Sequence, residues 1–202
     1  MLCQQRLSVY VKGGTCQSNS KPCDGNYLSG YCSGAASNQC CVDIGDCPLV
    51  VYSSANVKGY NSKTVYVEAD FVRHMDTIQS IAKSSQVTVY VTQAFRKDGV
   101  PVDGAIVPPA SHSNHLVGHA FDMNLDTPLG WCNSDCLLAA YLNPSYNSYA
   151  NNFIKQVMNN GLRWGGIWAP TDPVHIDDGL NVYNDPKWEE LYIQIQPACQ
   201  NI

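Results

Sequence analysis

The sequence is poor in charged side chains and has no long apolar segment. Charged residues make up 14% of its 202 residues, although hydrophobic residues reach an ordinary 45%. No apolar stretch is long enough to cross a bilayer, so we expect no membrane association. No run of Lys or Arg appears and the net charge is -5, which argues against nucleic acid as a partner. The surface must carry many uncharged polar side chains, which is typical of extracellular proteins.

Further absences narrow the class of protein. The chain lacks internal repeats of about 20–50 residues, which solenoids and propellers show. It also lacks the Cys-x-x-Cys pairs of zinc ribbons. It has no sequon for N-glycosylation, because proline occupies the middle of Asn143-Pro144-Ser145. No secretory leader is visible, so we expect that a leader has been removed from an exported protein.

Ten cysteines are present, a density that requires an oxidising compartment if the thiols are to pair. We predict disulfides rather than a cysteine metal site, and a secreted, extracellular protein. Full pairing requires at least one bridge between the early and the late cysteines, because both groups are odd in number. The spacing leaves the connectivity open. The groups are Cys3, Cys16, Cys23, Cys32, Cys40, Cys41 and Cys47, and Cys132, Cys136 and Cys199.

The composition changes near residue 47, which predicts two domains. Residues 1–47 are rich in Gly, Ser, Asn and Cys and have too few apolar residues for a core. This stretch is expected to be a loop-rich module held by disulfides. Residues 48–202 show helical and strand patterns that do not strictly alternate, which favours an α+β domain.

Hydrophobic periodicity predicts the elements of the second domain. Alternating residues indicate strands, and apolar residues at helical spacing indicate helices. Gly161 is the expected cap of the second helix. The expected strands are 64–67, 87–92, 119–125 and 174–177, and the expected helices are 70–84 and 149–160.

Two histidines and an aspartate indicate a metal site. Asp122 lies on the polar face of its expected strand, and His115 precedes this strand across Gly118, which lets the backbone turn back. His175 lies on another short strand. If these strands pair, two imidazoles and one carboxylate converge, and this set with an open fourth position is a catalytic zinc arrangement.

Longer motifs around these residues resemble a known family. Residues 113–122, SNHLVGHAFD, resemble the SxHxxGxAxD motif of the M15 peptidases. These include D-Ala-D-Ala carboxypeptidases of the VanY type and endolysin-like L-alanyl-D-glutamate endopeptidases. Residues 161–168, GLRWGGIW, are similar to the GFxWGGxW segment of the endopeptidase branch, and residues 172–175, DPVH, to its D-x-x-H motif. Residues 93–96, QAFR, match the place of the family's SGYR segment.

The resemblance implies an α+β fold shared with the Hedgehog signalling domain, in which helices pack on a small antiparallel sheet. It implies Zn²⁺ as the cofactor, with His115, Asp122 and His175 as ligands. It makes Asp172 the general base and acid, and Arg96 the residue that binds substrate or polarises the scissile carbonyl. The carboxypeptidase branch usually has Glu in place of Asp172, so this residue favours the endopeptidase branch.

The chemistry of amide hydrolysis fits these residue types. Zinc lowers the pKa of bound water to about 7, a nearby carboxylate can move the proton, and an arginine can pair with a carboxylate or an oxyanion. Ser113 and Asp177 are candidates to orient imidazole N–H groups. His119 is expected to flank the pocket. Trp168 could line a groove, although core packing is the usual role of Trp.

Residues 1–47 resemble a cysteine-rich module of secreted fungal hydrolases that act on bacterial walls. The resemblance rests on GYC at 30–32 and NQCC at 38–41. Binding of wall glycan and a purely structural role both fit such a module. Tyr10, Tyr27 and Tyr31 are candidates for stacking on sugar rings, and burial suits them equally.

The expected function is that of a secreted zinc metallopeptidase that hydrolyses peptidoglycan stem peptides, as an L-alanyl-D-glutamate endopeptidase. A D-alanyl-D-alanine carboxypeptidase is the first alternative. A non-catalytic, zinc-containing wall-binding module is an alternative of another class, and the carboxylate of Asp172 argues against it. We expect the protein to act as a monomer.

Overall fold

The computed structural model describes the chain except residues 1, 5–9, 24–25, 29–31, 43–46 and 103–105. The chain divides into two compact units, residues 1–48 with 184–202 and residues 49–183. The last helix groups with the first unit in this division, whereas the sequence placed it in the second domain; the predicted domain boundary stays a prediction. No described helix is both long and apolar enough to cross a membrane.

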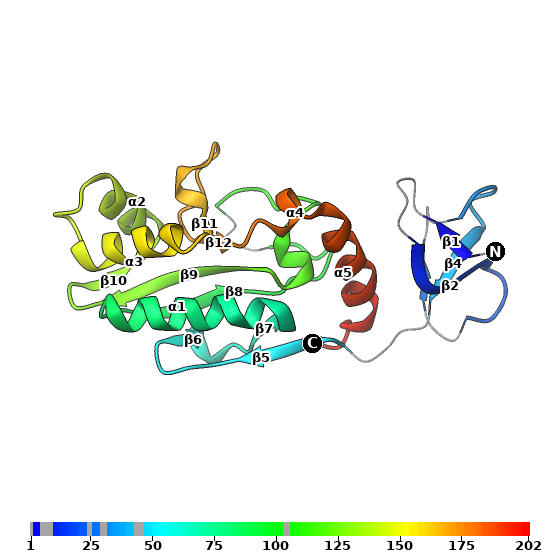
Figure 1. Cartoon of the computed structure of the whole chain (residues 1–202), viewed down its shortest axis with the longest axis horizontal. Helices are drawn as coiled ribbons and strands as arrows, with labels where there is room; N and C mark the ends of the chain where they lie inside the picture. The colour runs from blue at the N-terminus through cyan, green and yellow to red at the C-terminus, as the bar shows by residue number, and fades with distance from the viewer. Residues whose placement is uncertain (1, 5–9, 24–25, 29–31, 43–46, 103–105) are drawn as a thin grey trace. The chain divides into compact units, whose positions relative to one another are not determined.

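The first unit contains a small antiparallel sheet, which replaces the loop-rich module expected from the sequence (Figure 1). Disulfides Cys16–Cys32 and Cys23–Cys41 hold it together. Cys47–Cys199 confirms the predicted bridge between the early and late cysteines. The strands, in sheet order, are β1 (Leu2–Gln4), β2 (Tyr10–Ser18), β4 (Asn38–Val42) and β3 (Asn26–Leu28), and the helix of this unit is α5 (Asp185–Ala198).

The second unit is built on a sheet in the order β11-β12-β9-β8-β6, with β10 also paired to β9. Neighbours are antiparallel except β6 and β8, which are parallel, so the antiparallel sheet implied by the resemblance is mixed at one edge. A separate pair joins β5 (Leu49–Tyr52) to β7 (Val65–Glu68). The sheet strands are β6 (Val57–Gly59), β8 (Thr88–Gln93), β9 (Ala120–Thr127), β10 (Gly130–Cys132), β11 (Arg163–Trp164) and β12 (His175–Asp177).

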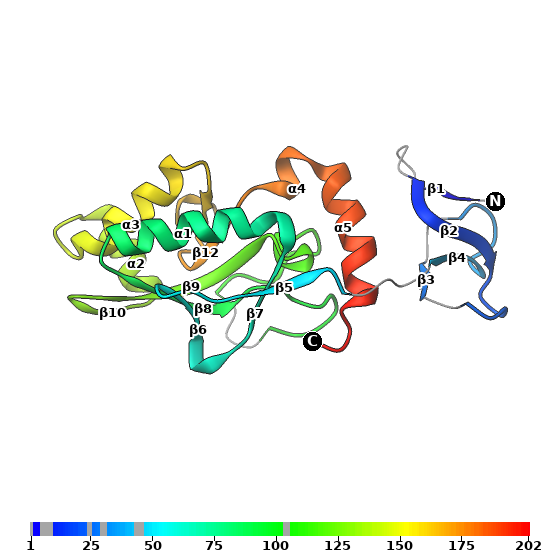
Figure 2. The same ribbon diagram turned by 60° about the horizontal axis from the view of Figure 1, so that its bottom comes forward.

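Helices α1 (Val72–Ser84) and α3 (Ser148–Asn159) pack on one face of this sheet, and α2 (Ser134–Leu142) packs on α3 and β10 (Figure 2). Alternation along β9 explains why one face is covered. Phe121, Met123 and Leu125 are completely buried in the core, whereas Asp122 and Asn124 are partly exposed. The other face of the sheet therefore remains available for a site, and the α+β class is confirmed.

Short helical turns complete the second unit. They are the 3-10 helices η1 (Tyr60–Ser62), η2 (Ala69–Phe71), η3 (Asn114–Val117) and η4 (Gly165–Ile167), and the four-residue helix α4 (Leu180–Tyr183).

Every element expected from periodicity forms within a few residues of its expected bounds. Gly161 follows α3 with φ 83°, as a helix-ending glycine does. The sequence did not indicate α2 or α5. The segment of α2 is apolar on almost all sides, so it has no helical stripe to detect.

Candidate metal centre

Three side chains from three separate elements converge on the open face of the sheet. His115 comes from η3, Asp122 from β9 and His175 from β12, and the last two are direct cross-strand partners. Gly118 ends η3 with φ 72°, and a Cβ there would lie 2.7 Å from the backbone nitrogen of Glu68. A glycine at this position therefore allows the turn that brings His115 back to β9.

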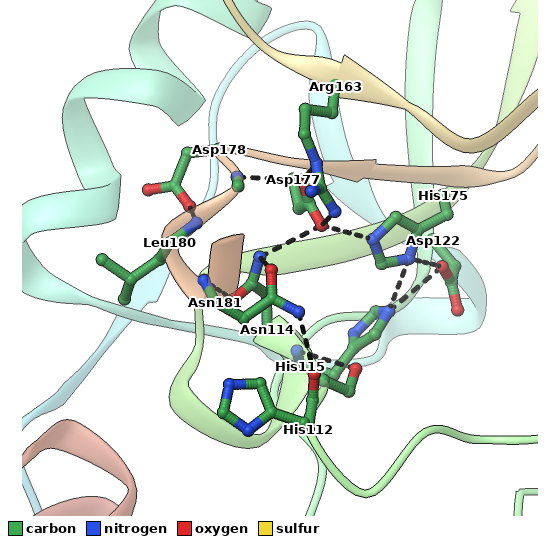
Figure 3. A network of polar contacts seen from close by, with 12 residues as sticks. His112, Asn114, His115, Asp122, Arg163, His175, Asp177, Asp178, Leu180 and Asn181 are labelled. Carbon is green, nitrogen blue, oxygen red and sulfur yellow. Dashed lines mark hydrogen bonds and ion pairs between the residues drawn. The ribbon is translucent and has the colours of Figure 1, made fainter. Parts of the chain in front are cut away.

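The distances within this cluster are short. His115 Nε2 lies 3.1 Å from His175 Nδ1, and each of these nitrogens lies 3.2 Å from Asp122 Oδ1 (Figure 3). The ligand atoms of all three residues lie within 4.8 Å of one another, a spacing at which they could hold one metal ion. The strand pairing that the sequence analysis required is thus present.

In each histidine ring, the nitrogen that points away from the cluster has a hydrogen-bond partner, and this partner determines whether the nitrogen inside the cluster carries a proton or a lone pair. His115 Nδ1 lies 2.6 Å from the carbonyl oxygen of Ala94, which can only accept, so this nitrogen donates. His175 Nε2 lies 3.1 Å from the carboxylate of Asp177, to which it donates. Each neutral ring then presents a lone pair inward, beside the Asp122 carboxylate. Three electron-rich atoms this close together need a cation between them.

The pKa shifts of Asp122 and His175 also indicate that the cluster is stabilised by positive charge. Burial raises the pKa of Asp122, but the charge and hydrogen bond of His115 and those of His175 outweigh burial and hold it well below its usual value. Burial lowers the pKa of His175, yet hydrogen bonds to Asp122 and Asp177 raise it to about 9. In the absence of a metal, protons would supply the missing charge.

Asp177 is the centre of the polar network behind His175 (Figure 3). It is 2% exposed. Arg163 donates to both of its oxygens, from Nε to Oδ1 at 2.7 Å and from Nη2 to Oδ2 at 2.9 Å. Asn114 Nδ2 donates to Oδ2 at 3.1 Å, and the backbone nitrogen of Gly179 donates to Oδ1. Burial raises the pKa of Asp177, but His175 and Arg163 outweigh burial and lower it, so the carboxylate is ionised and can orient the ring.

Trp168 packs against His175 and Arg163. Its ring lies 5.1 Å from the His175 ring, and the Arg163 guanidinium lies 4.8 Å from the Trp168 ring centroid. The indole is half-buried and lines the cavity described below. Trp164, in contrast, is completely buried and donates from Nε1 to the carbonyl oxygen of Pro173.

A cavity of about 910 Å³ opens over the cluster. Asp172 lines it, and its Oδ1 is buried without a hydrogen-bond partner among the described residues. Burial first, and then the charge of Asp122, raise the pKa of Asp172. A buried carboxylate oxygen with no donor beside a metal-type cluster can accept a proton from a bound molecule.

Gly165 holds the segment that carries Asp172. Its carbonyl oxygen accepts from the backbone nitrogens of Asp172 and Trp168. A Cβ at Gly165 would lie 2.4 Å from the carbonyl oxygen of Asp172. The absence of a side chain at Gly165 therefore permits a close backbone approach of the segment that carries Asp172.

The remaining predicted residues fall into two groups. Arg96 lines the cavity and donates from Nη2 to the carbonyl oxygen of Ala110. Burial lowers the pKa of Arg96 and outweighs the charges of Asp122 and Asp98, which raise it. Ser113 also lines the cavity, and its hydroxyl accepts from the backbone nitrogen of His115 at 3.3 Å. This contact positions the η3 backbone, and the role of orienting an imidazole that the sequence analysis assigned to Ser113 stays a prediction.

His119 is absent from the described residues that line the cavity. It lies buried between two carboxylates, with Nδ1 2.7 Å from Asp178 and Nε2 3.3 Å from Glu68. Burial lowers its pKa, but the two hydrogen bonds outweigh burial and raise it to about 8. Its described contacts are those of a charged structural residue.

The sequence analysis missed Arg163, Asn114 and Asn181. Asn114 and Asn181 hold each other through two hydrogen bonds, and Asn181 Nδ2 donates to the carbonyl oxygen of His112. A signal for Arg163 was available. Arg163 lies one position before Trp164. When its strand pairs with that of His175, Arg163 lies opposite Asp177, and opposite charges at such positions commonly pair.

Comparison with known proteins agrees with the resemblance seen in the motifs. Residues 108–178 match the sequence model of a family described as D-alanyl-D-alanine carboxypeptidase. This segment contains His115, Asp122, Asp172 and His175. No curated protein matches the chain. The fold and the site thus define a chain similar to peptidases, and the M15 peptidase resemblance is confirmed over this segment.

Proposed function

We propose that the protein is a secreted zinc metallopeptidase that hydrolyses the stem peptides of bacterial peptidoglycan. One observation carries the proposal: two inward imidazole lone pairs and a carboxylate converge within 3.2 Å, and over them opens a cavity lined by Asp172, whose Oδ1 has no hydrogen-bond partner among the described residues. A purely structural ion pair would not need that arrangement of acceptors.

The donor set fits zinc. Two imidazole nitrogens and one carboxylate oxygen are a common catalytic set, which leaves a fourth position for water or substrate. His115 and His175 would bind through Nε2 and Nδ1, because their other nitrogens are held by Ala94 and Asp177. Zinc held there would supply an acidic water and polarise a carbonyl oxygen.

Asp172 acts as the general base and then the general acid. Its raised pKa places it closer to the working range of a group that accepts and returns a proton. Arg96, on the cavity wall, pairs with a substrate carboxylate or the carbonyl oxygen under attack. Arg163 and Asn114 donate to Asp177 and through it hold the His175 ring in place.

The proposed bond is that between L-alanine and D-glutamate. The aspartate at position 172 and the Trp-Gly-Gly segment at residues 164–166 support this branch of the family. A second candidate is removal of the terminal D-alanine, which the description of the matching family favours. Both activities use the same ligands and differ in which part of the peptide lies over them.

The proposal includes secretion of the protein and a role for its first unit. The disulfides support an oxidising, extracellular location. The first unit would stabilise the protein or bind wall glycan. Tyr27 is part of its packing, because the hydroxyl donates to carbonyl oxygens of Ser18 and Lys21. The side chains of Tyr10 and Tyr31 lie outside the described residues.

Zinc content and product masses test the proposal together. Purified full-length protein should contain one zinc per chain and should cleave a defined disaccharide-tetrapeptide to products that carry a new amino group on D-glutamate. Free D-alanine from a pentapeptide would instead identify the carboxypeptidase. If zinc-loaded protein leaves both substrates intact, and Asp172→Ala binds them as tightly as the wild type, the non-catalytic wall-binding module replaces the enzyme.

A further inference from the structure

A cluster of exposed aromatic rings lies on the open face of the sheet. Trp131, on β10, contacts Tyr60 and Tyr90 with ring centroids 5.6 Å and 5.4 Å away. Trp131 is 47% exposed and Tyr60 37%. The two tyrosines restrain the indole while nearly half of it faces solvent. We call Tyr60, Tyr90 and Trp131 the aromatic shelf.

Strand register places the shelf on the same face as the metal ligand Asp122. Tyr90 pairs with Asn124, and Trp131 pairs with Asp126. Asp122, Asn124 and Asp126 alternate along β9 and therefore share one face. Along β9, Asp122 lies two residues from the position opposite Tyr90 and four from the position opposite Trp131, or about 7 Å and about 13 Å at roughly 3.3 Å per residue.

Residues close to the shelf in the chain line the cavity. Lys63, Thr92 and Asn133 line the cavity and follow the three rings within two or three residues in the same segments. Asn124, which pairs with Tyr90, and Ser134 also line it. One surface thus runs from the rings, past amide and hydroxyl groups, to the metal cluster.

The composition of this surface favours a sugar as its occupant. Pyranose rings present a C–H face that packs on aromatic rings, and hydroxyls that bond to amides and hydroxyls at the edge. The shelf combines exposed rings, each with an apolar body and a polar tip, with such polar neighbours. An exposed patch of this kind beside a cavity marks a binding surface.

We propose that the aromatic shelf binds the glycan strand of peptidoglycan while the attached stem peptide enters the cavity. The inference rests on the proposed function and names the part of the substrate that the site recognises. Stem peptides are attached to a sugar through a lactyl group. The nearer edge of the shelf, about 7 Å from Asp122 along the strand, lies at roughly two extended residue lengths, which the lactyl group and L-alanine span. The shelf therefore presents a bond close to the glycan, such as that between L-alanine and D-glutamate.

Paired substrates separate the shelf from the catalytic centre. One is a disaccharide-tetrapeptide and the other is the same tetrapeptide without sugar. Trp131→Ala should raise KM for the disaccharide-linked substrate about tenfold, which corresponds to 1.4 kcal/mol, with kcat unchanged. Hydrolysis of the free peptide should not change. Trp131→Phe should keep KM for the disaccharide-linked substrate close to the wild-type value. Tyr146→Ala, at a 59% exposed aromatic residue outside the shelf, should have the same KM as the wild type.

Direct binding gives a readout that does not depend on hydrolysis. Peptide-free glycan strands should bind the zinc-loaded full chain in calorimetry, and Trp131→Ala should lose about tenfold in affinity. Tyr60→Ala provides a second variant if Trp131→Ala does not fold. Glycan binding that Trp131→Ala weakens, in a protein that cleaves neither substrate, would refute the proposed function and support the shelf, whereas binding that Trp131→Ala leaves unchanged would assign it to another surface and overturn the shelf. Absence of glycan binding would overturn the proposal that the shelf binds glycan. An equal rise of KM on both substrates in Trp131→Ala would also overturn it, because the shelf would then bind the peptide.

Discussion

The Arg163 guanidinium holds both oxygens of Asp177, and Asp177 in turn holds Nε2 of His175 at 3.1 Å. This chain of contacts connects β11, which contributes no residue to the candidate metal cluster, to the orientation of His175 on β12. Asp177 is almost completely buried, so its charge depends on Arg163 and His175 for stabilisation. Arg163 is thus a positioning residue.

Arg163→Met should weaken zinc binding by about tenfold to a hundredfold, the usual cost of losing a partner behind a metal ligand. The ring of His175 would lose its fixed acceptor geometry when Asp177 loses its bidentate partner. Competition with a chromophoric chelator measures the zinc Kd. Lys187→Met removes an exposed pair with Glu190 and should leave the Kd unchanged. A wild-type zinc Kd for Arg163→Met would show that Arg163 only packs against Trp168.

Zinc should stabilise the wild type against heat, and chelation should reverse this. At a free zinc concentration one hundred times the Kd, binding to the folded state alone contributes about 2.7 kcal/mol. Differential scanning fluorimetry with and without zinc measures the shift in Tm. His115→Ala should abolish the shift, whereas His112→Ala, at a histidine that lines the cavity outside the cluster, should keep it. Equal shifts in both variants would place the zinc elsewhere.

Asp172→Asn should lower kcat by about a hundredfold to ten-thousandfold, the contribution typical of a general acid–base group. The amide has nearly the same size, and it replaces a carboxylate whose pKa is raised by burial first and then by the charge of Asp122, so the fold should persist. Zinc content and kcat on the stem peptide are the two measurements. Asp70→Asn, at an exposed aspartate, is the control. Undiminished kcat in Asp172→Asn would require another base.

The stability of the second unit should fall as the pH rises through 8. His119 has a pKa of about 8 in the folded state, above its ordinary value of about 6.5. The charged ring therefore stabilises the fold fully below pH 6.5, by on the order of 2 kcal/mol, and this contribution disappears above pH 8. Urea unfolding at pH 6 and pH 9 measures the difference. In His119→Gln the two values should lie closer together; the same drop as in the wild type would exclude His119 as its origin.

The sequence predicted the elements of the second unit because their hydrophobic patterns are regular. It also predicted that His115, Asp122 and His175 converge, because each lies in a motif and Gly118 marks the turn between two of them. It could not indicate α2, whose apolar residues surround the helix. It could not indicate that the Ser113 hydroxyl accepts from the His115 backbone nitrogen, because this contact depends on the local geometry of η3.

The amino-acid sequence by itself determined the chemistry that is available: two imidazoles and two carboxylates at motif positions, cysteines that must pair, and strands of alternating pattern. Only the tertiary structure decided which of these groups meet. The register of β12 on β9 set Asp122 opposite His175, that of β11 on β12 set Arg163 opposite Asp177, and that of β10 on β9 placed Trp131 on the same face. The physical reason is that a register shift of one residue turns every side chain to the other face of a sheet, and register depends on packing over the whole unit.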